Sequence, residues 1–148
     1  MHRLDELGRQ LNHLDNLFQQ WMKKLGFNQN AFAVLHSLAV SPDGKCTQKY
    51  ICERWSLPKQ TVFSICKLFK EQGLIDITES EHDKREKILT LTELGKKRTQ
   101  PILTQSQILS ERAFGALGQE RTQQLFSNLE GFCTLFEQEM ENVPGGSE

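Results

Sequence analysis

One segment constrains the fold of this chain more than any other: residues 82–95, which follow a short amphipathic pattern that ends at Gly73. A charged tip that holds Asp83 and Arg85 runs into a stretch of alternating apolar and polar residues, which is typical of a strand. Thr92 then suits the N-cap of a new helix. Helix, glycine stop, strand, basic tip, strand and helix follow one another in the order of a winged helix.

The tip carries three cations within four residues, Lys84, Arg85 and Lys87. Such a group suits contact with a polyanion such as the nucleic-acid backbone. The alternative is a solvated β-turn whose charges keep an edge strand from pairing with other chains. The tip alone does not separate the two interpretations, and the neighbouring segments are needed to choose between them.

The distribution of charge favours a basic middle segment. The 148 residues carry a net charge of −1, which by itself does not indicate a nucleic-acid partner. Residues 45–98, however, carry twelve Lys and Arg against eight Asp and Glu, a balance of +4. Because electrostatic contacts act over about one Debye length, a locally basic segment is sufficient to bind phosphate. The alternative is ordinary scatter of surface charge.

Several classes of protein find no support in the sequence. The four cysteines form no Cys-x-x-Cys pair and no cluster with histidine at metal-ligand spacing. There is no signal peptide and no apolar run of transmembrane length. A Ser/His/Asp set, a phosphate-binding glycine loop and paired carboxylates in a recognisable context are also absent. We therefore expect a reduced cytoplasmic protein with no catalytic residues, no metal, no other cofactor and no membrane partner.

Both ends of the chain carry a long amphipathic helix pattern. Leucines and aromatic residues recur in steps of three and four from Leu4 to Leu25, and a second stripe runs from Leu125 to Met140. Neither stripe has a partner within its own segment. We expect the two helices to pack on each other, on a second copy of the chain, or both. The alternative is that both simply cover the central domain.

The central elements are expected to be short helices. Asn28 can cap a helix that runs to about residue 39, and Thr47 can cap one that runs to about Trp55. Pro58 suits the first turn of the next helix, residues 58–72. The inward side of that helix is expected to hold Val62, Ile65, Leu68 and Phe69. Two short helices with a three-residue break between them form a helix-turn-helix.

The remaining elements complete the predicted winged helix. Strands at 74–78 and 87–91 should pair as a hairpin across the charged tip. Thr92 should open a helix that runs toward Phe114, and Pro101 should kink or restart it.

The outward face of helix 58–72 has the side chains that a helix in the major groove needs. Gln60 can make a two-pronged contact to adenine, while an arginine such as Arg85 can enter the minor groove. Asp83 is expected to position Arg85 or simply to form the turn. The residues expected to contact DNA are Gln48, Lys49, Lys59, Gln60, Thr61, Ser64, Lys67, Asp83, Lys84, Arg85 and Lys87. A plain solvated helix face would look similar.

The chain resembles the MarR family of bacterial winged-helix transcription regulators over roughly residues 4–140. The motifs that carry the resemblance are Gly73-Leu74-Ile75, Asp83-Lys84-Arg85, Leu91-Thr92-Glu93-Leu94-Gly95, residues 28–35, Pro58-Lys59-Gln60-Thr61-Val62-Phe63 and Gly118-Gln119-Glu120. The resemblance implies a mainly α fold with a small β-wing, in which terminal dimerisation helices flank a winged helix-turn-helix. We expect one domain over residues 1–148, with a DNA-binding lobe at 28–98 and dimerisation regions at 1–27 and 99–142.

The resemblance also implies a function. We expect a transcriptional repressor that binds double-stranded DNA with a near-palindromic operator as a homodimer. A small aromatic effector is also expected to release the protein from DNA. The candidate residues for binding it are His13, Trp21, Phe32 and His36. The alternative is that these residues form an ordinary aromatic core. The chain departs from the family pattern at Ser64, Leu68, Glu86 and Pro101. A winged helix that serves only for protein contacts, without specific DNA binding, is the alternative.

Overall fold

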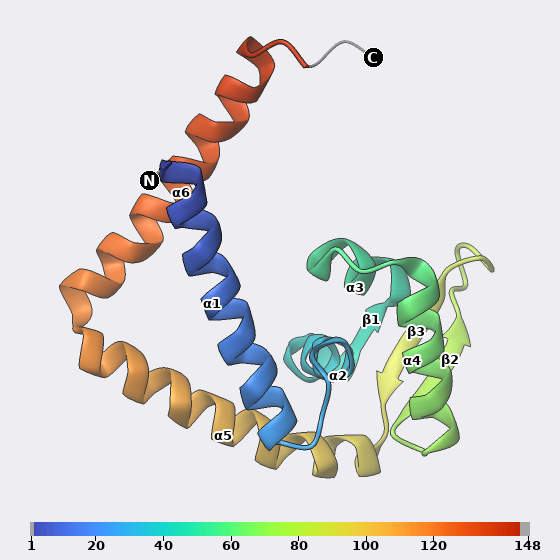
Figure 1. Ribbon diagram of the computed structural model, residues 1–148. Helices are drawn as coiled ribbons and strands as arrows, with labels where there is room; N and C mark the ends of the chain where they lie inside the picture. Colours follow the sequence, from blue (N-terminus) through green and yellow to red (C-terminus); the bar gives the residue numbers. More distant parts are fainter. Residues whose placement is uncertain (1, 146–148) are drawn as a thin grey trace. The chain divides into compact units, whose positions relative to one another are not determined.

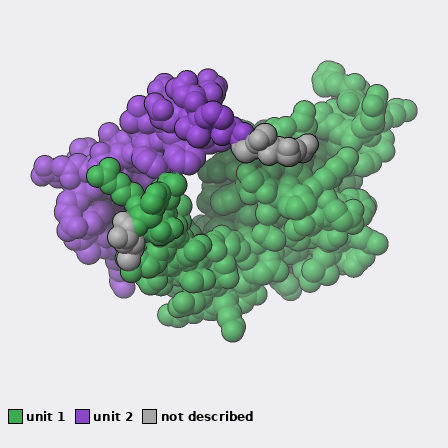
Figure 2. Space-filling model, turned by 45° about the horizontal axis from the view of Figure 1, so that its top comes forward, with its two compact units in different colours: residues 1–104 green, residues 105–148 purple. Residues whose placement is uncertain are grey.

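The computed structural model describes residues 2–145, so Met1 and residues 146–148 of the expected domain lie outside the described part. Two compact units, residues 1–104 and 105–148, are distinguished in Figure 2. Along the chain (Figure 1) the elements are α1 (Arg3–Lys24), α2 (Gln29–Val40), η1 (Pro42–Gly44), β1 (Lys45–Thr47), α3 (Gln48–Trp55), α4 (Lys59–Glu71), β2 (Ile75–Glu79), β3 (Lys87–Leu91), α5 (Glu93–Leu117) and α6 (Gln119–Asn142). The expectation of a mainly helical winged fold is confirmed.

The core of the first unit lies where α2, α3 and α4 pack against the small sheet. Its fully buried side chains include Leu38 of α2, Ile51 of α3, Val62 of α4 and Leu89 of β3. Each of these residues comes from a different element. Burial of apolar area on this scale is the main stabilising contribution to such a lobe.

The predicted hairpin is present, and it belongs to a sheet with one more strand. β2 and β3 pair antiparallel with Ile77 opposite Leu89. β1 pairs with the other edge of β3 and places Cys46 opposite the same leucine. The sequence did not predict β1, because three residues are too few to show the alternation that marks a strand.

The helix starts follow the predicted capping residues. The Asn28 side chain accepts a hydrogen bond from the backbone N–H of Ala31 at 2.7 Å, and Thr47 accepts one from Tyr50 at 3.0 Å. Ser56 ends α3 in the left-handed conformation, which turns the chain toward α4. These local bonds fix where each helix begins and therefore the angle between the two helices of the helix-turn-helix.

The inward face of α4 differs from the prediction at one residue. Val62, Cys66 and Phe69 are buried, whereas Leu68 is 50% exposed. At about 100° per residue, position 68 lies roughly 240° around the helix from position 62, well away from the buried side. The expectation that Leu68 points inward was therefore wrong, and Cys66 fills the place beside Val62 instead.

Helix α5 runs without a break from Glu93 to Leu117, with Pro101 inside it. The expected restart at this proline does not occur. A proline deprives the carbonyl of the residue four positions earlier, Lys97, of its helical donor. Lys97 is exposed, so water can hydrogen-bond that carbonyl and the helix can continue.

Helix α6 buries none of its described residues within the chain. Its apolar stripe stays open, with Leu125, Leu129, Phe132 and Phe136 each more than 40% exposed. Within the second unit, the ring of Phe126 lies 5.5 Å from that of Phe114 at the end of α5. The stripe is thus an apolar surface that the second unit does not itself cover.

Helix α1 shows the same feature in the first unit. Leu4, Leu11, Leu14 and Phe18 are each about half exposed, and Met22 is the buried side chain of the helix. The predicted stripe extended to Leu25, which instead caps the end of α1. None of the helices within residues 2–145 has the length and apolarity that crossing a bilayer requires.

Candidate nucleic-acid interface

The first turns of α4 present polar side chains at the surface. Lys59, Gln60 and Ser64 are exposed, while Thr61 is half-buried. The Ser64 hydroxyl donates to the carbonyl of Gln60 at 2.9 Å, so it retains only acceptor capacity for an outside partner. Lys67 is exposed one turn further along. The start of the helix therefore carries a long amide and a lysine that are free to reach outward.

The charged tip between β2 and β3 is a hydrogen-bonded turn. The Asp83 carboxylate accepts the backbone N–H of Arg85 at 3.0 Å and lies 3.8 Å from its Nε. The backbone carbonyl of Asp83 accepts the N–H of Glu86 at 2.9 Å. At the base of the turn, the hydroxyl of the buried Ser80 accepts the N–H of His82 at 3.2 Å. The Arg85 side chain remains 96% exposed and projects from this ordered turn.

Two further cations of the interface already have an anionic partner. Lys87 Nζ lies 3.1 Å from Glu79 across the hairpin, where the two residues are in register. Lys49 Nζ lies 3.9 Å from Glu53, one turn along α3. Exposed pairs of this kind are weak and open readily to another anion. They nevertheless reduce the attraction that each lysine offers to a phosphate.

The starts of α3 and α4 and the hairpin tip enclose one hollow of about 480 Å³. Its lining comprises Gln48, Lys49, Cys52, Glu53, Lys59, Asp83, Arg85, Glu86 and Lys87. The fold thus brings together six predicted DNA contacts from three separate segments. Four cations face three carboxylates here, so the hollow is only slightly positive. Glu53 was not expected at this site, because nothing in the sequence indicates its proximity to the tip.

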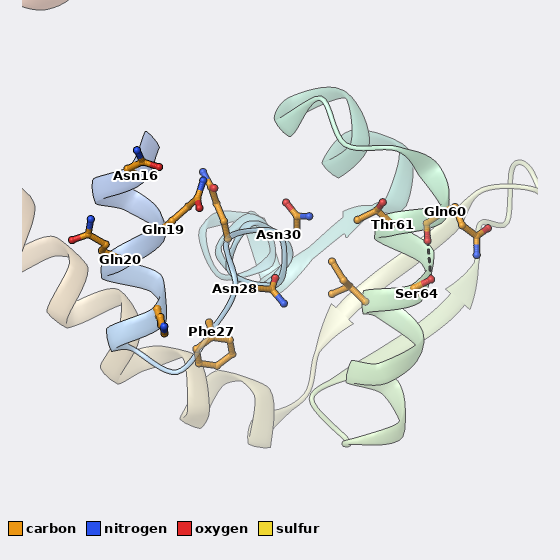
Figure 3. Close-up of a pocket in the computed structure, with 12 residues that line it drawn as sticks. Asn16, Gln19, Gln20, Phe27, Asn28, Asn30, Gln60, Thr61 and Ser64 are labelled. Atoms are coloured by element: carbon orange, nitrogen blue, oxygen red, sulfur yellow. Dashed lines mark hydrogen bonds between the residues drawn. The ribbon is translucent and has the colours of Figure 1, made fainter. Parts of the chain in front are cut away.

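A larger hollow of about 1000 Å³ lies between α1, the start of α2 and α4 (Figure 3). Gln60, Thr61 and Ser64 line it on the α4 side, and Thr61 extends toward Asn30. The opposite wall carries Asn16, Gln19, Gln20 and Lys23 of α1. These α1 residues were not predicted to belong to a site, although their amides, spaced three and four apart, mark one face of a helix. The hollow is therefore rich in side-chain amides, with Phe27 and Ile65 as apolar parts of its lining.

The candidate effector residues fall in different places. Phe32 and His36 stack with ring centroids 5.4 Å apart and line a small void with Leu35, Thr99, Ile102 and Leu103. The free space there is too narrow for a water molecule. His13 lines a separate hollow on α1, and Trp21 lies under the Lys24 ammonium group at 5.9 Å.

The His36 imidazole is chemically exceptional among these residues. Its Nδ1 atom is buried without a hydrogen-bond partner. Burial lowers the pKa of His36, and the nearby charge of Arg54 lowers it further. The neutral imidazole is therefore favoured, and its Nδ1 atom can bond to an outside group only if the side chains around the void move apart.

The cysteines of the first unit are free thiols in or beside the core. Burial raises the pKa of the Cys66 thiol to about 12, with the neighbouring Cys46 and Cys52 adding to the effect. Because the thiolate is the reactive form, Cys66 is unreactive near neutral pH. Among the described residues, no group of three or more His, Cys, Asp or Glu has the geometry to hold a metal ion.

Comparison with known proteins gives a consistent match. A family model described as the MarR family matches residues 25–86. The chain is 29% identical over 119 residues to the HTH-type transcriptional regulator SarZ of Staphylococcus epidermidis, covering 79% of this chain and 76% of that protein.

Solved structures extend the match over nearly the whole chain. A MarR family regulator from Neisseria meningitidis is 41% identical, with a TM-score of 0.83, and the alignment covers 96% of this chain and 99% of that one. The Staphylococcus aureus MepR–DNA complex shares the fold at 18% identity, with a TM-score of 0.73 and coverage of 90% and 98%. The SarZ protein is a transcriptional regulator, and the Neisseria protein is a MarR family regulator.

Proposed function

Since the chain belongs to the MarR family of DNA-binding transcriptional regulators, we propose that it represses transcription as a homodimer bound to a near-palindromic operator. In this proposal residues 28–98 form the DNA-binding lobe, and residues 1–27 and 99–142 hold the two copies together. A protein that binds chromosomal DNA in this way acts in the bacterial cytoplasm.

The observation that carries the proposal is the convergence of α3, α4 and the hairpin tip on one side of the lobe. The exposed start of α4 supplies Gln60 for base contacts, and Arg85 projects from the tip. Lys49 and Lys59 line the hollow between these elements, where a phosphate backbone can pass. Lys67 and Lys84 add exposed charge beside it. Together they form a helix that can contact the bases, flanked by residues that can contact the phosphates and so position the protein, as in winged-helix recognition of DNA.

The dimer is supported by apolar surface that a single chain leaves open. The stripes of α1 and α6 expose large side chains such as Leu14, Phe18, Phe132 and Phe136. Exposed patches of this kind mark interaction sites in proteins that remain in solution. We propose that a second copy of the chain covers this surface, in keeping with its membership of the family. Every molecule carries the same stripes, so two copies can cover each other without a further partner.

We extend the proposal to a small aromatic effector that weakens DNA binding. The support is the void beside Phe32 and His36, with its unpartnered Nδ1 atom. Ile102 or Leu103 would have to move to admit a ring. A panel of small phenols should raise the melting temperature of the parent protein and not that of the His36→Leu variant. Equal stabilisation of both proteins would exclude this void as the binding site.

Binding-site selection from a random duplex pool tests the DNA-binding proposal. The parent should return a near-palindrome whose half-sites lie about one helical turn apart. The Gln60→Ala protein should lose preference at one or two positions per half-site and keep non-specific affinity, which comes from phosphate contacts. Identical motifs from the two proteins would remove Gln60 from base reading. If the parent returns no motif, the repressor proposal fails in favour of a protein-contact module.

A further inference from the structure

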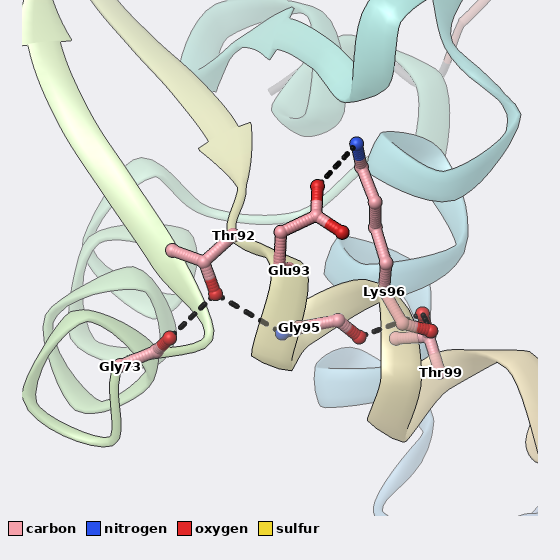
Figure 4. A network of polar contacts seen from close by, with 6 residues as sticks. All are labelled: Gly73, Thr92, Glu93, Gly95, Lys96 and Thr99. Atoms are coloured by element: carbon pink, nitrogen blue, oxygen red, sulfur yellow. Dashed lines mark hydrogen bonds and ion pairs between the residues drawn. The ribbon is translucent and has the colours of Figure 1, made fainter.

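One hydroxyl group joins the end of α4 to the start of α5 (Figure 4). Thr92 Oγ1 donates to the carbonyl of Gly73, which follows α4, at 2.6 Å. The same oxygen accepts the backbone N–H of Gly95, in the first turn of α5, at 3.0 Å. A hydroxyl is the smallest side-chain group that can donate and accept at once. Thr92 therefore serves as a bridge as well as an N-cap.

The backbone reinforces this bridge. The N–H of Thr92 donates to the carbonyl of Leu74 at 3.0 Å, and the N–H of Leu74 donates to Phe69 of α4 at 2.9 Å. Gly73 takes a left-handed conformation, φ 72°, that turns the chain sharply out of α4. The exit from α4 is thus hydrogen-bonded on both sides of the turn.

Close packing removes the remaining freedom between the two helices. Gly95 is buried, and a Cβ atom at this position would collide with the carbonyl oxygen of Leu74. The Thr99 hydroxyl donates to the carbonyl of Gly95 at 2.9 Å, which holds the next turn of α5 in place. Since Leu74 also bonds to Thr92 and to α4, the end of α4 has no room to slide along α5.

We propose that Thr92 is a positioning residue for base reading. It fixes α4 on the first turn of α5, so that α5 sets the angle at which Gln60 enters the groove. This inference rests on the proposed role of α4 in DNA recognition. Base contacts depend on placement to a fraction of an ångström, whereas phosphate contacts tolerate small shifts. Loss of the bridge should therefore reduce sequence discrimination rather than general affinity for DNA.

Two variants separate the hydrogen bonds from the shape of the side chain. Thr92→Val keeps the shape and removes both bonds, and Thr92→Ser keeps the hydroxyl. Thr78→Val, at an exposed position of β2, is the matched control. Affinity is measured for the operator that the parent selects and for a scrambled duplex of equal length. Thermal unfolding of each variant identifies a temperature at which all are folded.

The valine variant should lose roughly tenfold or more in affinity for the operator and stay within about twofold for the scrambled duplex. The serine and control variants should keep the operator-to-scrambled ratio of the parent. A folded valine variant with the parental ratio, or with equal losses on both duplexes, would overturn the inference.

Should the valine variant fail to fold, Thr92→Cys gives the same test by comparison with Thr92→Ser, because a thiol takes the place of the serine hydroxyl and is a weaker donor and acceptor. Its ratio should fall, and an unchanged ratio would count against the proposal. The parent protein serves as an internal check. If the parent itself selects no operator, the proposed function fails, whereas a parental operator with an unchanged variant ratio overturns only the role of Thr92.

Discussion

The winged-helix lobe and helix α6 use the same amphipathic pattern with opposite results. In the lobe, Leu38, Ile51 and Leu89 are completely buried against residues from other elements. In α6 no described residue is buried, and Leu135 is 60% exposed. The difference lies in whether the element has a facing surface within its own unit. Apolar periodicity thus specifies that a helix will be covered without specifying which molecule covers it.

Because of this contrast, we expect substitutions in the two regions to have different effects. In the lobe, apolar side chains stabilise the fold of one chain. In α1 and α6, they are expected to stabilise the association of two chains. Pairs of variants, one in each region or one on each side of a helix, test whether the two regions differ in this way.

Charge placed in the α6 stripe should have the largest effect. Leu129→Glu combined with Phe132→Glu should dissociate the dimer. Operator affinity should then fall by about 100-fold or more, because a monomer cannot bind both half-sites of the operator at once. The matched control, Ser127→Glu with Gln138→Glu, adds the same charge on the opposite side of α6 and should behave like the parent. Sedimentation velocity and fluorescence anisotropy give the two readouts. A stripe variant that stays dimeric would assign α6 to another purpose.

Truncation of an apolar side chain should lower the free energy of unfolding more in the lobe than in α6. Leu38→Ala should lower the free energy of unfolding by about 2–5 kcal/mol, since it leaves a cavity among packed residues. Leu135→Ala should cost less than about 1 kcal/mol, because that side chain is largely exposed in the chain. Urea unfolding at one fixed protein concentration allows the comparison. Similar losses in the two variants would show that α6 belongs to the same core.

Substitutions at the wing should alter DNA binding and leave the oligomer intact. Arg85→Ala should weaken operator binding by roughly 1–3 kcal/mol if its guanidinium reaches the groove. Lys87→Ala should cost less, because Glu79 already pairs with that lysine. Lys84→Ala should act nearly uniformly on all sequences. Anisotropy titrations on operator and scrambled duplexes distinguish these cases. Parental affinity in the Arg85→Ala protein would remove the wing from the interface.

The sequence predicted those parts of the lobe that depend on local chemistry. Asn28 and Thr47 cap their helices as expected, because an N-cap bond spans only three residues. The hairpin was also visible, since its strands flank a polar tip. Strand β1 was not, because its pairing with β3 depends on residues more than forty positions away. Leu68 was misplaced for a different reason: it lies roughly 240° around α4 from Val62, so helical periodicity alone places it away from the buried side.

The candidate site shows the same limit. The cations of the tip and of α4 could be recognised from the sequence as surface charge. Asp83 beside Arg85 could also be predicted, whereas Glu53 could not, because it lines the hollow at the tip only through the packing of α3 against the hairpin. The bridge made by Thr92 was half visible: its capping role follows from sequence, whereas its bond to Gly73 requires the fold. The sequence alone did not show which distant segments lie close together in space.

Acid should weaken the lobe through His36, the smallest effect in this series. The pKa of His36 is lowered in the folded lobe by burial and then by Arg54, relative to its ordinary value of 6.5. The unfolded chain therefore binds a proton more readily, so stability falls as the pH drops below the ordinary value toward the lowered one. His36→Gln should flatten the change in urea midpoint between about pH 7.5 and about pH 5.5. His82→Gln, in the exposed wing, is the control.

A pH dependence that persists unchanged in His36→Gln would exclude this histidine as its source. Because His36 lies in the lobe, the same variant should keep the mass of the parent in sedimentation at neutral pH. A change of mass would mean that the division between the two regions is incomplete.

Sedimentation equilibrium of the intact chain, without DNA, shows whether two copies of the protein associate. The apolar stripes of α1 and α6 are each exposed within their own unit, and a second copy is the proposed cover. At concentrations on the order of micromolar, we expect a single species with twice the mass of the chain. A compact, stable monomer at those concentrations would rule out the proposed dimer, because no second copy would then cover the stripes.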